Sequence, residues 1–180
     1  LAYMYLGQEI PHKAGRIIKS GMHSREIESN AKNVETLANA WAQANEHREA
    51  IPALQNAARL SDKGSLYARL AGVYFDTGDF VNAASAARKA NHKGGLKRAG
   101  NNQMLLGMAL FNLNDFEAAL QAFRQAKESK IIFSDARKWE AYALNEIKRL
   151  RTIEQRKFRL SKETEDTLKA EENNSEAIGH

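Results

Sequence analysis

The sequence predicts an all-α fold, a right-handed superhelix of antiparallel helix pairs closed by a C-terminal capping helix. Composition is the first reason, since only 2 of 180 residues are Pro and 11 are Gly. The commonest residues include Ala, Leu, Lys and Glu, which lose little freedom in a helix. The second reason is a motif that recurs every 33 to 36 residues. The third is helical i, i+4 spacing of large apolar residues inside each motif.

Four leucines mark the repeat: Leu1, Leu37, Leu70 and Leu106, separated by 36, 33 and 36 residues. Small residues recur in register with them, where two helices must approach closely. They are Ala38, Ala71 and Gly107 on the first helix of each pair and Ala50, Ala83 and Ala119 on the second. We interpret each unit as a helix pair whose apolar stripe is buried only by stacking on the neighbouring pair.

The period divides the chain into a solenoid over residues 1–150 and a charged tail over 154–180. Inside the solenoid we expect a partial repeat over 1–30, full repeats over about 31–63, 64–99 and 100–130, and a capping helix over 134–153. We interpret the opening at Leu1 as the remainder of a repeat cut internally, so that any targeting signal lies upstream. Apolar spacing fades beyond Ile153, and we therefore expect the tail to be solvated and flexible.

Several function classes are excluded or disfavoured by residue types. The chain has no Cys, which removes disulfides, thiolate metal sites and cysteine nucleophiles. Its five His show no His-x-x-x-His spacing, so no metal site is expected. No apolar run approaches the roughly 18 residues that cross a bilayer. We predict a protein that is not an enzyme, with no catalytic residues, no cofactor and no small-molecule substrate. An accessory domain of a larger enzyme stays open as an alternative.

The chain has a net charge of +5, and near the C-terminus its charges form two blocks of opposite sign that nearly balance. Residues 137–162 hold nine basic residues against three acidic ones, and residues 163–180 hold six acidic residues against Lys169. A solvated helix is the ordinary outcome of such a pattern. Binding of a polyanion, either nucleic acid or an anionic membrane surface, through this basic helix is the alternative function, and we do not favour nucleic acid as a partner.

The repeated residues resemble the tetratricopeptide repeat (TPR), over residues 1 to about 150. One stretch, Gly94–Gly100 running into Leu105–Leu113, more narrowly resembles the periplasmic TPR proteins associated with the TonB, ExbB and ExbD systems of gamma-proteobacteria. The first resemblance implies a non-catalytic scaffold for protein–protein interaction. The second implies a periplasmic location, with a cytoplasmic one as the alternative, and partners among TonB-system components.

The TPR resemblance also implies where a partner binds. In such a superhelix the first helix of each pair lines a concave groove, which would accept a peptide or helix of the partner. Counting from the anchor leucines, the groove residues are Glu35, Asn39, Gln43, Phe75, Asp76, Met104, Met108, Phe111 and Asn112. The apolar members have an alternative role, which is to pack against a neighbouring helix or a terminal segment. A carboxylate clamp is not expected, because Asn39 alone matches its basic and amide pattern.

Overall fold

The computed structural model describes residues 2–7 and 10–178, and these contain helices and connecting loops but no strand. The helices are α1 (Ala2–Gly7), α2 (Pro11–His23), α3 (Ala31–Gln43), α4 (His47–Ser61), α5 (Gly64–Asp76), α6 (Phe80–Lys93), α7 (Ala99–Asn112), α8 (Phe116–Ala126) and α9 (Phe133–Ile178). The predicted all-α fold is confirmed. The anchor Leu1 lies outside the described residues.

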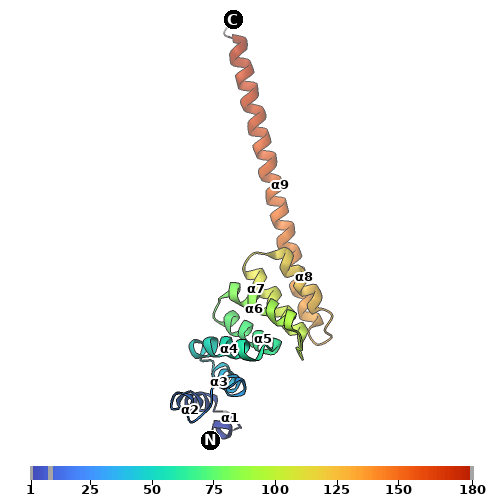
Figure 1. Ribbon diagram of the computed structural model, residues 1–180. Helices are drawn as coiled ribbons and strands as arrows, with labels where there is room; N and C mark the ends of the chain where they lie inside the picture. Colours follow the sequence, from blue (N-terminus) through green and yellow to red (C-terminus); the bar gives the residue numbers. More distant parts are fainter. Residues whose placement is uncertain (1, 8–9, 179–180) are drawn as a thin grey trace.

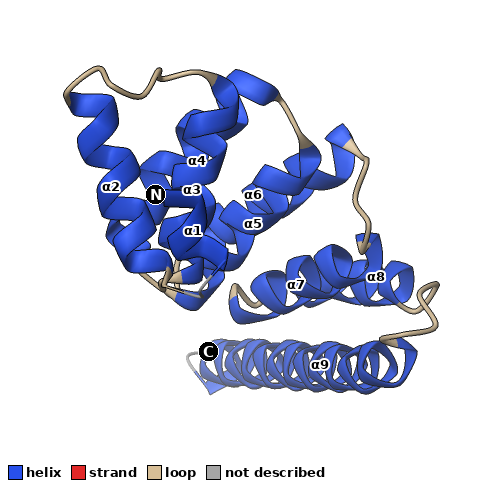
Figure 2. Ribbon diagram, turned by 90° about the horizontal axis from the view of Figure 1, so that it is seen from below, coloured by secondary structure: helices blue, strands red, loops and turns tan. Residues whose placement is uncertain are grey.

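Consecutive helices pack in antiparallel pairs, α3 on α4, α5 on α6 and α7 on α8, and each pair stacks on the next. Figure 1 shows this stack rising from the N-terminal helices towards α9. In Figure 2, seen from below, the pairs follow one another in a curve. Helices α3, α5, α7 and the start of α9 also contact one another in series. The first helices of the pairs therefore form one continuous surface.

Short turns join the two helices of each pair, and their sequences explain the sharp reversal. Gly78 has a φ of 77° and Asn114 a φ of 61°, the left-handed conformation that these residue types tolerate. An aspartate follows each of them. The Asp79 carboxylate accepts a hydrogen bond from the Asn82 backbone N–H at 3.1 Å, and Asp115 caps α8 in the same way.

The small residues lie where the helices meet. Ala38, Ala50, Ala71, Ala83 and Ala119 are fully buried. Gly107 faces the ring of Phe123, so closely that an added Cβ would lie 2.4 Å from a ring carbon. The anchors Leu70 and Leu106 are buried, whereas Leu37 is half-buried. Small side chains therefore set the distance between helices, and aromatic and leucine side chains fill the space that remains.

Helix α9 differs from the sequence-based expectation of a capping helix that ends at residue 153. It is a single helix of 46 residues that leaves the stack as a long rod (Figure 1). No Gly or Pro interrupts residues 133–178, and Lys, Glu, Arg and Leu are good helix formers, so nothing in this segment stops the helix. The expected flexible tail is therefore helical through Ile178, and residues 179–180 lie outside the described part.

The first third of α9 docks on α8 and α7. Ala136, Ala143 and Ile147 are buried there, and Trp139 stacks on Phe123 with ring centroids 5.6 Å apart. Glu140 accepts hydrogen bonds from Arg124 of α8 and from Lys127, the residue that follows α8. The Lys127 hydrogen bond, aided by Arg124, holds the pKa of Glu140 below its usual value.

Candidate functional site

The nine residues predicted to line the groove lie on the first helices of the three full pairs. All nine are at least partly accessible. Gln43, Asp76 and Asn112 are exposed, and the half-buried members are Glu35, Asn39, Phe75, Met104, Met108 and Phe111. Because α3 contacts α5 and α5 contacts α7, these residues belong to adjoining stretches of one surface, which we call the first-helix face.

The α3 end of the first-helix face is polar and already hydrogen-bonded. Lys63 Nζ donates to the Glu35 carboxylate at 2.7 Å, and an Arg69 guanidinium N–H donates to Asn39 Oδ1 at 2.6 Å. Lys63 and Arg69 were not among the residues predicted from the sequence to line this face. In the sequence, each acceptor is followed by a basic residue 28 or 30 positions later, which is about one helical turn short of a full repeat. This spacing could have indicated the two contacts.

From Phe75 of α5 onward to α7, this face is apolar. Phe75 packs edge-on against Phe80 at 5.4 Å, and Phe111 packs in the same way against Phe116 at 5.0 Å, 36 residues further on. Phe111 also contacts Trp139 of α9 at 5.5 Å. The alternative role, packing against a terminal segment, thus applies to Phe111 in part.

Gly72 on α5 lies between these two ends. A Cβ added to Gly72 would meet no atom within 4 Å, whereas a Cβ at Gly107 would overlap a buried ring. The backbone of α5 is therefore uncovered at the middle of the first-helix face. Met104 and Met108 of α7 are half-buried against the core and have the adaptable side chains typical of peptide-binding surfaces.

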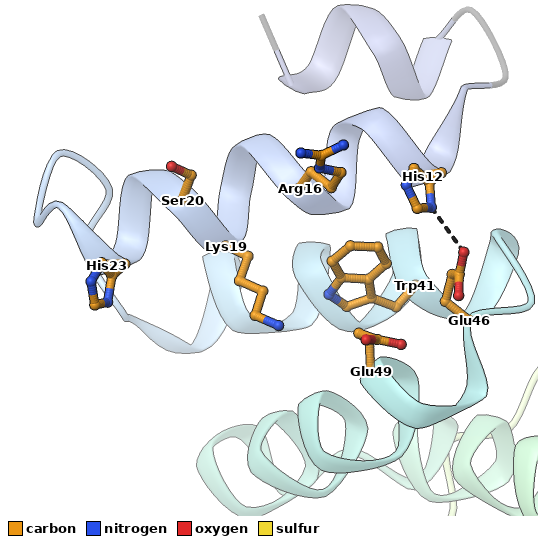
Figure 3. A pocket seen from close by; sticks show the side chains of 8 residues that line it. All are labelled: His12, Arg16, Lys19, Ser20, His23, Trp41, Glu46 and Glu49. Carbon is orange, nitrogen blue, oxygen red and sulfur yellow. Dashed lines mark hydrogen bonds and ion pairs between the residues drawn. The ribbon is translucent and has the colours of Figure 1, made fainter.

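A hollow lies between α2, α3 and α4 (Figure 3). It is a cleft of about 800 Å³ whose α2 wall carries a row of basic and polar side chains. Trp41, which is buried, lies between this wall and Glu46 and Glu49. The α2 residues that line the cleft are His12, Arg16, Lys19, Ser20 and His23.

The cleft has opposed charges, and one contact bridges it. His12 Nδ1 lies 2.9 Å from a Glu46 carboxylate oxygen, and the His12 ring meets Trp41 edge-on. This surface was not predicted from the sequence, because its histidines lack the spacing of metal ligands. The signal was the spacing of residues 12, 16, 19 and 23, which places them on one face of a helix.

Other site classes find no support in the described part of the chain. Residues 2–7 and 10–178 hold no cluster of three or more His, Asp or Glu side chains placed to bind a metal. Within the same ranges no helix is long and apolar enough to cross a membrane.

Comparisons with known proteins agree with this geometry. A family model described as the tetratricopeptide repeat matches residues 101–130, which include most of α7 and all of α8. The structure is similar to that of YrrB, described as a TPR protein with an unusual peptide-binding site, with a TM-score of 0.66, 17% identity, and 79% of this chain and 72% of that chain covered. The fold is that of a tetratricopeptide-repeat superhelix.

Two further structures share the TPR fold. MamA MSR-1 matches with a TM-score of 0.62 and 18% identity, over 71% of this chain and 72% of that one. The Arabidopsis OM64 TPR domain matches with a TM-score of 0.56 and 18% identity, over 64% of this chain and 94% of that one. Comparison with curated protein sequences finds no match. At these identities the likeness concerns the fold.

Proposed function

We propose that this TPR protein is a non-catalytic scaffold that binds a peptide or helix of a partner protein on its first-helix face. The fold itself supports an interaction role, because stacked helix pairs present one long surface. YrrB has the same fold and is described as carrying a peptide-binding site. In this chain the site would consist of the nine groove residues, with Lys63 and Arg69 added at its polar end.

The observation that carries this proposal is the open space above Gly72. It lies between a polar end, where Glu35 and Asn39 hold basic partners, and an apolar end with Phe75, Met104 and Met108. A bound segment can thus lie close to the α5 backbone, and its apolar side chains can contact the methionines. Glu35 and Asn39 orient Lys63 and Arg69, whose remaining N–H groups can meet carbonyl or carboxylate oxygens of the ligand.

Blocking that space tests the proposal. Peptides selected from a random library on the intact chain should bind the wild type but lose binding to Gly72→Trp, because the indole would occupy the space above α5. The matched control is Val81→Trp on α6, which adds an indole at a side chain that is already 64% exposed. Selected peptides that bind Gly72→Trp as well as they bind the control would contradict the groove site.

A finer proposal concerns the partner and the compartment. We infer from the stretch Gly94–Leu113 that the protein acts in the periplasm within a TonB-type energy-transduction system. The test is co-purification of the intact chain, expressed in a gamma-proteobacterium, with TonB, ExbB and ExbD. Capture by the wild type and by Val81→Trp, with loss in Gly72→Trp, would support both the system and the site. Absence of all three components from every eluate would refute this partner assignment while leaving the peptide-binding test unaffected.

A further inference from the structure

One side of α9 carries basic residues and no acidic ones over a long stretch. Residues 137–162 include nine basic residues and three acidic residues. At about 100° per residue, eight of the nine basic residues fall within a sector roughly 160° wide, and Lys157 is the exception. All three acidic residues lie outside that sector. We call the sector over residues 137–162 the basic face, and at 1.5 Å per residue it is about 38 Å long.

The basic face points away from the solenoid. Ala136, Ala143 and Ile147 are buried against the solenoid, and the centre of the basic face lies about 140° around the helix from them. In Figure 2, α7 and α8 lie on one side of α9 only. All eight basic side chains of the face are exposed. The solenoid therefore leaves the whole basic face accessible to a ligand.

Most of the charge on the basic face is not neutralised within the described structure. Two of the eight cations pair with a carboxylate outside the face, each three residues away on α9. The other six have no carboxylate partner among the described side chains. Arg159 has like charges at helical neighbour positions on both sides, Arg156 and Lys162, and such spacing is repulsive. An anion bound along the face would relieve this repulsion.

The arrangement of cations across the basic face fits the groove of a DNA duplex. Arg151 and Lys162 lie at one margin of the face and Arg149 and Arg156 at the other, with Gln155 between them. The major groove of B-DNA is about 12 Å wide and admits an α-helix. In that position the cations of the two margins would face the phosphates of the two strands, and the Gln155 amide would face base edges. Arginine is well suited to this role, because its guanidinium can donate two hydrogen bonds to one phosphate.

We propose that the basic face of α9 binds double-stranded DNA, with α9 lying in the major groove. The charge count alone did not favour nucleic acid as a partner, because a count does not show that the cations share one side of a helix. This role is separate from peptide binding on the first-helix face and is compatible with it. It requires a compartment that contains DNA, so it is an alternative to the periplasmic assignment.

An anionic membrane surface is the competing occupant, because basic helices also bind lipid headgroups. Glu163 and Asp166 continue the sector of the basic face immediately beyond Lys162, and residues 163–178 carry a net charge of −5. If α9 lay flat on an anionic membrane, these residues would come to the same negative surface. A duplex that crosses α9 within residues 137–162 would not meet them. The limited length of the basic face therefore favours DNA.

Fluorescence anisotropy of a labelled DNA duplex of about three helical turns, titrated with the intact chain, measures the binding. If about six phosphates are contacted, the affinity should fall about a thousandfold between about 50 and 200 mM salt. In Arg156→Gln/Arg159→Gln the dissociation constant at about 100 mM salt should rise at least about tenfold, because two phosphate contacts are lost. Both side chains are exposed, so circular dichroism should show an unchanged fold.

The matched control is Arg88→Gln/Lys157→Gln, which removes the same charge from exposed positions on α6 and on the other side of α9. It should raise the dissociation constant less than about threefold, because neither residue belongs to the basic face. An equal rise in both double variants would mean that total charge, and not the basic face, attracts DNA, and would overturn the proposal. So would a wild type that leaves the duplex unbound at about 50 mM salt, whether or not it binds phosphatidylglycerol vesicles. Gly72→Trp should bind the duplex as the wild type does, so this test and the peptide-binding test can fail separately.

Discussion

Replacing Gly107 by Ala tests whether close helix approach, and not helix propensity alone, dictates the small residues of the repeat. Gly107 lies inside α7, and its Cβ would be 2.4 and 2.6 Å from two carbons of the Phe123 ring. Non-bonded carbons prefer about 3.5–4.0 Å, so the ring would have to move by roughly 1 Å. Phe123 is fully buried and stacked on Trp139, which leaves it little room to move.

Two opposing effects set the change in the free energy of unfolding that Gly107→Ala should cause. Overpacking of this kind costs about 1–3 kcal/mol. Replacing Gly by Ala inside a helix stabilises the fold by about 0.5–1 kcal/mol. We therefore expect Gly107→Ala to lower the free energy of unfolding by up to about 2 kcal/mol. The matched control is Gly72→Ala on α5, where an added Cβ meets nothing within 4 Å and should stabilise by about 0.5–1 kcal/mol.

Urea unfolding of the intact chain, followed by circular dichroism, is the assay. Because both changes are Gly to Ala inside a helix, the propensity term cancels in the difference between them. That difference should be about 1–3 kcal/mol in favour of Gly72→Ala. Adding Phe123→Leu to Gly107→Ala should recover part of the loss, since the smaller side chain makes room for the methyl group. Equal midpoints for Gly107→Ala and Gly72→Ala would refute the reasoning.

Three further predictions concern the core, a buried amide and the α8–α9 contact. Trp41→Ala should lower the free energy of unfolding by about 3–5 kcal/mol in the same urea assay, because it leaves a cavity beside Gly15; a loss below about 1 kcal/mol would mean that α2 closes over the gap. Asn102→Ala should lower the free energy of unfolding by about 1–3 kcal/mol, because Asn102 is buried and its amide donates to Ala87 O at 2.8 Å and to Asn91 Oδ1 at 2.7 Å. The matched control, Asn101→Ala at an exposed neighbour, should lower it by less than about 0.5 kcal/mol. The folded-state pKa of Glu140 is depressed by Lys127 and Arg124, so its contribution is present above the unfolded pKa of about 4.3 and is lost as pH falls further. The midpoint of thermal unfolding should therefore drop more steeply between pH 6 and pH 3 in the wild type than in Glu140→Gln, and parallel pH profiles would contradict this assignment.

The fold class could be predicted from the sequence because each repeat contains all the local residue pattern that the prediction needs. A small residue next to each anchor leucine, and an Asp after Gly78 and Asn114, each act within one helix pair, so spacing along the chain was sufficient to predict them. The accessible positions of the first-helix face also follow from helical periodicity. The end of α9 was not predicted correctly. The fading of apolar spacing after Ile153 reports loss of burial, and burial is not required for a segment of good helix formers to remain helical.

The candidate site was less predictable for a different reason. The contacts of Lys63 with Glu35 and of Arg69 with Asn39 join residues from two repeats, and they depend on the rotation between neighbouring pairs. Trp139 reaches Phe111 only because α9 packs across the end of the last pair. The cleft between α2 and Glu46 depends on the gap between two pairs in the same way.

The sequence by itself determined the helical period, the pairing of helices and the division of charge along the C-terminal segment, because each depends on residues close together in the chain. The tertiary structure decided which side chains meet across repeats, how much of Phe111 stays accessible, and that α9 continues as one helix beyond the solenoid. Those outcomes depend on the angle and distance between packed helices, which many side chains set jointly and no single spacing encodes.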